Sequence, residues 1–257
     1  MRFAVLGSGS RGNAAVVDCH GVRLLLDAGL SAKQLVLRLH AVGVPPESLD
    51  GVLLTHEHGD HTRGLRVFLN SFAMPVYGTR DTLSMVRKTG AEARWRTFEA
   101  GEAFSVRHLV IDPFAIQHDA VDPVGFVLRY REKAFGVLSD AGHVTRSVIA
   151  KLRDIHALFV EANYDEDLLE ADRKRPWPTK QRISSQHGHL SNTQVIELLG
   201  EIAHPALGQV VLGHLSEDCN KPELALRLMR ECLCRRGLTT AAVHCASQHQ
   251  PTGWFTI

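Results

Sequence analysis

The sequence predicts an α/β protein of layered sheets with helices on the outside. Short apolar runs of strand length recur along the chain, many of them early and in hairpin-like succession, while helical patterns are spread through both halves. No internal repeat or low-complexity linker divides the 257 residues, and 44% of them are hydrophobic. We therefore expect one domain over 1–257 with a sizeable buried core.

Strands are predicted wherever a short apolar run is bounded by glycine or polar residues. The predicted strands are 3–6, 14–18, 22–26, 51–54, 109–116, 125–131, 134–138, 156–160, 208–213 and 239–244. The spacing of these runs leaves room for helices between many of them.

Three helices are predicted from residues that cap a first turn. Ser31, with Gln34 three residues on, opens 31–42, and Ser191, with Gln194, opens 191–203. The third is 220–236, opened by Asn220 with a proline and a glutamate in its first turn. A different pattern occurs at 172–186, where two prolines and several Lys or Arg residues predict an exposed loop.

Net charge, the length of apolar stretches and the cysteine spacing exclude several classes of protein. The formal net charge is +1, so nucleic-acid binding would need a local patch. No uninterrupted apolar stretch of about 18 residues occurs, and the N-terminus lacks the pattern of a signal peptide. The five cysteines form an odd set without a CxxC pair, which fits reduced thiols. We expect a cytoplasmic protein without a membrane segment or a zinc ribbon.

A dense group of metal-ligand side chains follows the apolar run 51–54. His56, His58, Asp60 and His61 lie within six residues. Alternation in an extended turn can direct His56 and His58 toward one ion, while Asp60 and His61 can face a second ion. Two divalent ions roughly 3.5–4 Å apart are the usual arrangement for hydrolysing phosphate esters. The sequence therefore predicts a dinuclear metal-dependent hydrolase.

Further ligand candidates follow other apolar runs in the same way. His118, Asp140 and His214 each follow the end of a predicted strand within two residues. A carboxylate such as Asp140 can bridge two cations, and this set of ligands accepts zinc, manganese or iron. Asp27 also ends a strand, and we interpret it as a carboxylate that orients a ligating histidine.

These motifs resemble the metallo-β-lactamase fold hydrolases, whose hallmark Thr-His-x-His-x-Asp-His is present at 55–61. The resemblance covers nearly the whole chain and implies a four-layer αββα sandwich. It implies that one metal is held by His56, His58 and His118. It implies that the other is held by Asp60, His61 and His214, that Asp140 bridges them, and that Asp27 is the orienting aspartate.

Within that superfamily the chain resembles the YycJ/WalJ-type exonuclease subfamily. The shared motifs lie at 7–13, 27–29, 118–123, 161–163, 188–192 and 214–220. This resemblance implies a DNA 5′-to-3′ exonuclease. RNase Z-like relatives add a proton relay, and the similarity gives its roles to Glu161 and His189, with His189 protonating the leaving oxygen.

The expected mechanism is attack on phosphorus by a hydroxide that bridges the metals and is oriented by Asp60. Two groups of residues are candidates for holding a phosphate. They are Ser8, Ser10 and Asn13 in the first glycine-rich loop, and Ser191 and Asn192 at a helix N-terminus. The basic segment 173–182 with Trp177 has the composition that binds a single strand.

Three alternatives share this scaffold. They are a hydrolase of small cyclic or nucleotide phosphodiesters, a thioesterase of the glyoxalase II kind, and a non-catalytic metal-binding partner. The Glu161 and His189 pair favours phosphodiesters over thioesters, and the full set of ligands argues against a non-catalytic protein. The oligomeric state, the native metal and the choice between DNA, RNA and a small ester stay open.

Overall fold

Two seven-stranded sheets lie face to face in the computed structural model, which describes residues 1–257. The first sheet consists of β1 (Arg2–Gly7), β2 (Ala14–Cys19), β3 (Val22–Leu26), β4 (Gly51–Leu53), β5 (Pro75–Gly78), β6 (Arg94–Thr97) and β14 (Phe255–Thr256). The second consists of β7 (Phe104–Val106), β8 (Leu109–Ala115), β9 (Val124–Tyr130), β10 (Lys133–Leu138), β11 (Ala157–Glu161), β12 (Gln209–Gly213) and β13 (Ala242–Cys245).

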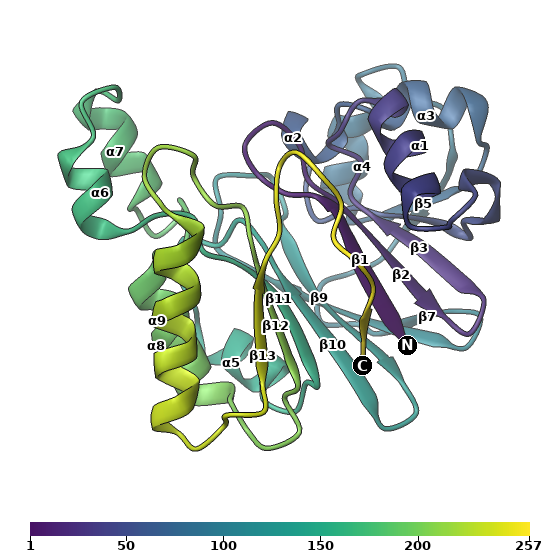
Figure 1. Ribbon diagram of the computed structural model, residues 1–257. Coiled ribbons are helices and arrows are strands. Elements are labelled where there is room, and N and C mark those ends of the chain that lie inside the picture. The colour runs from purple at the N-terminus through teal and green to yellow at the C-terminus, as the bar shows by residue number, and fades with distance from the viewer.

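Helices cover the outer face of each sheet (Figure 1). Those of the first half are α1 (Ala32–Ala41), η1 (Pro46–Ser48), α2 (Gly59–Thr62), α3 (Leu65–Ser71) and α4 (Arg80–Arg87). In the second half, α5 (Arg146–Leu152), α8 (Asn192–Ile202) and α9 (Pro222–Arg235) cover the sheet, while α6 (Glu166–Ala171) and α7 (Trp177–Ile183) extend beyond the body of the sandwich. The predicted four-layer αββα sandwich is confirmed. None of these helices is both long and apolar enough to cross a membrane.

Three apolar clusters hold the four layers together. The central cluster joins the two sheets through side chains such as Phe3, Phe126 and Phe135, all fully buried. A second cluster lies between the first sheet and helices α1, α3 and α4, and a third lies between the second sheet and α5, α8 and α9. Burial of apolar surface on both faces of each sheet is the main favourable contribution to folding.

Parallel pairing brings several strand ends to one edge of the sandwich. In the first sheet, β3 and β4 are parallel neighbours; in the second, β10, β11 and β12 are. The carboxyl ends of parallel neighbours lie side by side, and the loops beyond them form the usual site in α/β proteins. The side chains that follow these five strands are therefore brought into one region.

Each of the ten predicted strands has a counterpart, with the largest shift at β13, which begins at Ala242 instead of 239. The strands β5, β6, β7 and β14 were not predicted. They are two to four residues long, and β6 has the polar sequence Arg-Trp-Arg-Thr, so no apolar run marks it. β6, β7 and β14 are edge strands and β5 lies beside β6; such short strands form because a neighbouring strand supplies hydrogen bonds, which a local pattern does not show.

Capping explains where two of the predicted helices begin. Ser31 accepts a hydrogen bond from Gln34 N at 3.3 Å, and Ser191 with Gln194 forms a reciprocal capping box at the start of α8. The prediction for Asn220 was wrong: α9 has Lys221 at its N-cap position without a side-chain cap. The Asn220 side chain is buried, where it donates to Ala162 O at 2.8 Å.

The segment 172–186 was predicted to be a loop, and this is correct only in part. Residues Trp177–Ile183 form α7, with Pro176 at the N-cap and Pro178 in the first turn. Proline is tolerated there because the first N–H groups of a helix have no intrahelical partner. The segment is exposed as expected.

The five cysteines are all free thiols, as predicted.

Candidate metal centre

The loop between β4 and α2 carries four of the predicted ligands. His56 and His58 lie in the extended loop, while Asp60 and His61 lie on the single turn of α2. The loop is packed tightly against the turn after β3: an added Cβ on Gly29 would lie 1.5 Å from the Asp60 carbonyl oxygen. Only glycine allows this approach, which fixes α2 beside the end of β3.

Three imidazoles form the first cluster. The ring of His56 lies 4.7 Å from that of His58 and 5.1 Å from that of His118, and His58 and His118 are 5.0 Å apart. Their ligand atoms all lie within 4.8 Å of one another. His118 Nδ1 donates to the Gly188 carbonyl oxygen at 3.0 Å, which leaves its Nε2 free to bind a metal.

The state of His56 fits a metal ligand. Its side chain is fully buried, Nδ1 lies 3.0 Å from Thr55 Oγ1, and Nε2 has no hydrogen-bond partner. Burial, together with the charge of His61, holds the pKa of His56 well below its usual value. The neutral imidazole that results is the form that ligates metals, and a bound cation would satisfy its orphaned nitrogen.

A second cluster is built around Asp140. Asp140 Oδ2 lies 3.0 Å from His61 Nε2, and Oδ1 lies 2.9 Å from His214 Nδ1. Asp60 Oδ2 lies 3.6 Å from His61 Nε2 and 3.7 Å from His214 Nε2. Burial raises the pKa of Asp140, but the charges of His214 and His61 outweigh it and hold the pKa well below its usual range. The carboxylate is thus ionised and central, as a bridging ligand must be.

Three residues of this centre have left-handed backbone conformations. Asp27, Asp140 and His214 have φ of +57°, +56° and +48°. Asp27 and His214 are the first residues after β3 and β12, and Asp140 is the second residue after β10. Such angles are uncommon for residues with a side chain and are concentrated at functional sites. Here they reverse the direction of the chain at the sheet edge.

The buried carboxylate of Asp27 orients the second cluster. Asp27 Oδ2 accepts from His61 Nδ1 at 2.7 Å, and its two oxygens accept from the backbone N and hydroxyl of Thr55, each at 2.8 Å. This fixes the His61 tautomer and directs Nε2 toward Asp140. Thr55, the first residue of the hallmark motif, had no predicted role of its own; it links Asp27 to both His56 and His61.

We predict that Asp27→Asn weakens metal binding about 10- to 100-fold. Asparagine tolerates the positive φ at this position, so the fold should be retained while the charge that holds His61 is lost. Titration of the metal-free protein with zinc against a competing chelator measures the affinity. An unchanged affinity, with an unchanged melting temperature of the metal-free protein, would contradict the orienting role.

Glu161 and His189 lie beside the second cluster. Glu161 Oε2 lies 3.0 Å from His189 Nδ1, while Oε1 accepts from the backbone N of Ala141 at 2.5 Å and of Leu190 at 3.2 Å. Burial lowers the pKa of His189, but the charge and hydrogen bond of Glu161 outweigh it and raise the pKa to about 9. The His189 side chain is 21% exposed, so its other nitrogen is accessible to a substrate.

The predicted substrate contacts are mostly engaged within the protein. Ser8 Oγ accepts from His214 N at 2.7 Å, and Asn13 Nδ2 lies 3.1 Å from His61 Nε2. Asn192 pairs with the Asn220 amide, and Ser191 caps α8; all four candidates are buried. Contact of these side chains with a phosphate stays a prediction. Ser10 is the candidate whose side chain is exposed.

Two further residues contribute to the centre without having been selected from the sequence. Asp119 Oδ1 lies 3.3 Å from His118 Nε2 and 4.0 Å from His58 Nε2. Asn163 donates to the His214 carbonyl oxygen at 2.8 Å, which supports the strained turn after β12. The signal for Asp119 was its place next to a predicted ligand, and Asn163 lies in a motif shared with the resembling subfamily.

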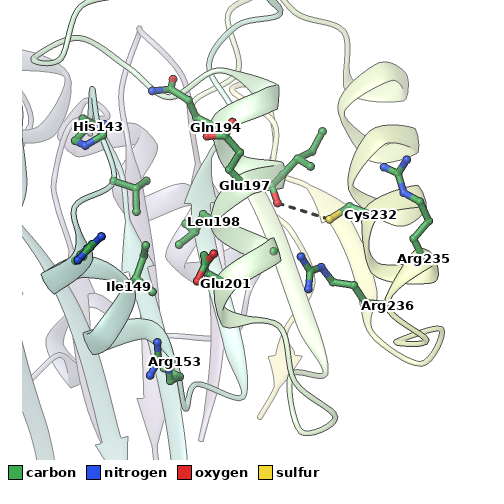
Figure 2. Close-up of a pocket in the computed structure, with 14 residues that line it drawn as sticks. His143, Ile149, Arg153, Gln194, Glu197, Leu198, Glu201, Cys232, Arg235 and Arg236 are labelled. Atoms are coloured by element: carbon green, nitrogen blue, oxygen red, sulfur yellow. Dashed lines mark hydrogen bonds between the residues drawn. The ribbon is translucent and has the colours of Figure 1, made fainter.

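A large cavity lies outside this centre. It has a volume of about 1080 Å³ and lies among α5, α8 and α9 (Figure 2). Arg146, Arg153, Arg235 and Arg236 line it together with two glutamates of α8. The lining has one imidazole, His143, and two carboxylates, but no group of three or more side chains able to hold a metal ion, so we locate the functional site at the sheet edge.

Comparisons with known proteins agree with this geometry. The sequence profile of the family described as "Beta-lactamase superfamily domain" matches residues 22–215. The protein named exodeoxyribonuclease WalJ of Streptococcus pneumoniae is 32% identical over 229 residues, which cover 87% of this chain and 85% of that protein. Exodeoxyribonuclease YycJ of Bacillus anthracis is 28% identical, covering 92% and 90%.

A solved structure shows the same architecture. The metallo-β-lactamase fold protein YhfI from Bacillus subtilis superimposes with a TM-score of 0.76 at 17% identity, covering 98% of each chain. A four-layer sandwich with a cluster of histidines and aspartates able to bind metal ions defines a metal-dependent hydrolase of the metallo-β-lactamase fold. The chain belongs to the beta-lactamase superfamily, in the group of the WalJ and YycJ proteins.

Proposed function

We propose that this protein is a metal-dependent DNA exonuclease that degrades its substrate in the 5′-to-3′ direction. The observation that carries the proposal is the Glu161–His189 pair, which lies 3.0 Å apart beside Asp140. Ester cleavage needs a proton donor for the leaving oxygen, and a carboxylate-oriented imidazole is a suitable donor. The names of the two relatives, which cover most of the chain, favour DNA as the substrate.

We infer that the two clusters hold two divalent ions of zinc, manganese or iron. One site comprises His56, His58 and His118. The other comprises Asp60, His61 and His214, with Asp140 between the two. When bound, the ions acidify water and neutralise charge on the phosphate. The buried, neutral His56 and the ionised Asp140 are the donors that such cations require.

Asp60, Asp27 and His189 have separate roles in the reaction. Asp60, whose side chain is 22% exposed, faces the open side of the centre and orients the attacking water. Asp27 keeps His61 in one tautomer through the 2.7 Å hydrogen bond to Nδ1. His189, held through Nδ1 by Glu161, presents its Nε2 to the departing oxygen and gives it a proton. The leaving group is thereby released as an alcohol.

The decisive experiment is degradation of end-labelled single-stranded and double-stranded DNA in manganese or zinc. A 5′-to-3′ exonuclease releases a 5′ label at once as a short product, whereas a 3′ label persists on a ladder of shortening strands. Asp60→Ala and an excess of chelator should both abolish the ladder. RNA, bis-p-nitrophenyl phosphate and a glutathione thioester run in parallel.

Each other outcome identifies a different function. Early release of a 3′ label would reverse the polarity but keep the nuclease. Cleavage of only the small ester would indicate a hydrolase of small cyclic or nucleotide phosphodiesters. Cleavage of the thioester alone would overturn the argument from Glu161 and His189.

A further inference from the structure

One large aromatic side chain projects into solvent from the helical hairpin of α6 and α7. Trp177 is 65% exposed, the most exposed of the large hydrophobic side chains of the protein. It lies in the first turn of α7, in a helical hairpin with α6 that extends beyond the body of the sandwich (Figure 1). Exposure of a tryptophan is costly, which marks such positions as candidates for recognition.

The hairpin is fixed to the metal centre at the other end of α7. The Ile183 carbonyl oxygen accepts from His189 N at 2.9 Å, and Arg182 Nε donates to Asp119 Oδ2 at 2.6 Å. Asp119 in turn lies 3.3 Å from His118 Nε2. An added Cβ on Gly188 would lie 2.1 Å from the Ile183 carbonyl oxygen, so the two segments touch through their backbones. Helix α7 is therefore held in a defined position relative to the centre.

Most of the hairpin's positive charge is already neutralised. Lys174 pairs with Asp218, and Arg175 lies 2.9 Å from Asp172 and 3.1 Å from Asp218. Arg182 is engaged by Asp119, as described above. The expectation that cations of this segment attract a strand is thus weakened, because paired side chains have little charge left for phosphates. Arg173 has no ion pair and Lys180 donates only to the Glu170 carbonyl oxygen, so the hairpin offers the aromatic face of Trp177 together with these two charges.

We propose that Trp177 is a stacking platform for a base of the single-stranded DNA end that enters the centre. This inference rests on the proposed function and names how the substrate is held. The six steps along α7 from Trp177 to Ile183 span about 9 Å of helix at ~1.5 Å per residue, comparable with two to three stacked bases at ~3.4 Å. The platform therefore engages bases a few nucleotides away from the scissile bond. Every base has a π-face, so the platform imposes no sequence preference.

The acidic residues of α6 determine which of the two helices a DNA strand follows. Helix α6 bears Glu166, Asp167 and Glu170 on exposed positions, where they repel phosphates. Helix α7 bears no acidic residue. A strand that leaves the centre is therefore directed along α7 and past Trp177.

The test compares Trp177→Ala and Trp177→Phe with the native protein, all in the metal-loaded form. We expect Trp177→Ala to raise KM for single-stranded oligodeoxythymidylate by roughly 5- to 150-fold, with kcat little changed. Trp177→Phe should have a KM close to that of the native protein, because phenylalanine retains an aromatic face. Turnover of bis-p-nitrophenyl phosphate, which is too small to reach the platform, should be the same in all three proteins.

Leu37→Ala is the matched control. Leu37 is 51% exposed on α1, in the opposite helix layer, so its loss removes a similar apolar surface away from the centre. The proposal is overturned if Trp177→Ala leaves KM for DNA unchanged. It is also overturned if that variant loses as much activity on the small ester as on DNA.

A binding measurement separates this inference from the proposed function. Anisotropy of a labelled, nuclease-resistant phosphorothioate oligodeoxythymidylate gives Kd without turnover. If the native protein binds it through Trp177 but degrades no DNA, the exonuclease proposal fails and the platform stands. If DNA is degraded while KM and Kd are the same for Trp177→Ala and the native protein, the platform fails alone.

Discussion

Replacing His58 by alanine is expected to reduce phosphodiester turnover by at least ~10³-fold and to lower the metal content from the two ions per chain that we propose toward one. His58 supplies one of the three imidazoles of the first cluster. A catalytic metal contributes several kcal/mol to transition-state stabilisation, and each ~1.4 kcal/mol changes the rate tenfold. Elemental analysis of the purified protein and the bis-p-nitrophenyl phosphate assay measure the two effects.

His40→Ala is the control for this prediction. His40 is an exposed histidine in the last turn of α1, outside both clusters, so neither metal content nor turnover should change. Full activity of His58→Ala with two bound ions would show that His58 is not a ligand. The side chain of His58 is 29% exposed, so its removal should leave the fold intact and the comparison interpretable.

The ligand candidates were predictable because each follows an apolar run. A side chain at the carboxyl end of a strand is placed by the sheet itself, and parallel pairing of β10, β11 and β12 brings Asp140, Glu161 and His214 together. What the sequence did not reveal is the left-handed backbone at Asp27, Asp140 and His214. A non-glycine residue gives no local sign that tertiary contacts will hold it in that conformation.

The supporting contacts were harder to predict than the ligands. Thr55 donates to the Asp27 carboxylate, and Asn163 donates to the His214 backbone oxygen. Both partners are distant in the sequence, so these hydrogen bonds form only when the strand ends have come together at the sheet edge. The pair of Arg182 and Asp119 joins segments 63 residues apart. Composition correctly indicated a polar, exposed segment at 172–186, but it did not reveal that Asp119 and Asp218, which lie outside the segment, pair with three of its cations.

His189→Ala is expected to slow DNA cleavage about 10²- to 10⁴-fold while both metal ions stay bound. The variant removes the proton donor and leaves the three-imidazole cluster intact. His189 also lies within reach of a metal ion, because its ligand atom and those of Asp140, Glu161 and His214 are all within 4.8 Å of one another, so the metal content must be measured with the rate. Glu161 keeps the hydrogen bonds from the backbone N of Ala141 and Leu190, so its buried carboxylate is still solvated by the protein. Metal analysis and single-turnover cleavage of an oligonucleotide measure the two quantities.

The choice of substrate tests the role of His189 directly. A p-nitrophenolate departs without a proton, so the variant should lose much less activity on bis-p-nitrophenyl phosphate than on DNA. His187→Ala, an exposed histidine two residues earlier, is the matched control and should behave like the native protein on both substrates. Equal losses on the two substrates, or a loss of metal, would assign His189 to metal binding instead of proton transfer. A loss confined to DNA identifies the leaving oxygen as the atom that His189 protonates, because the two esters differ most in their need for that proton.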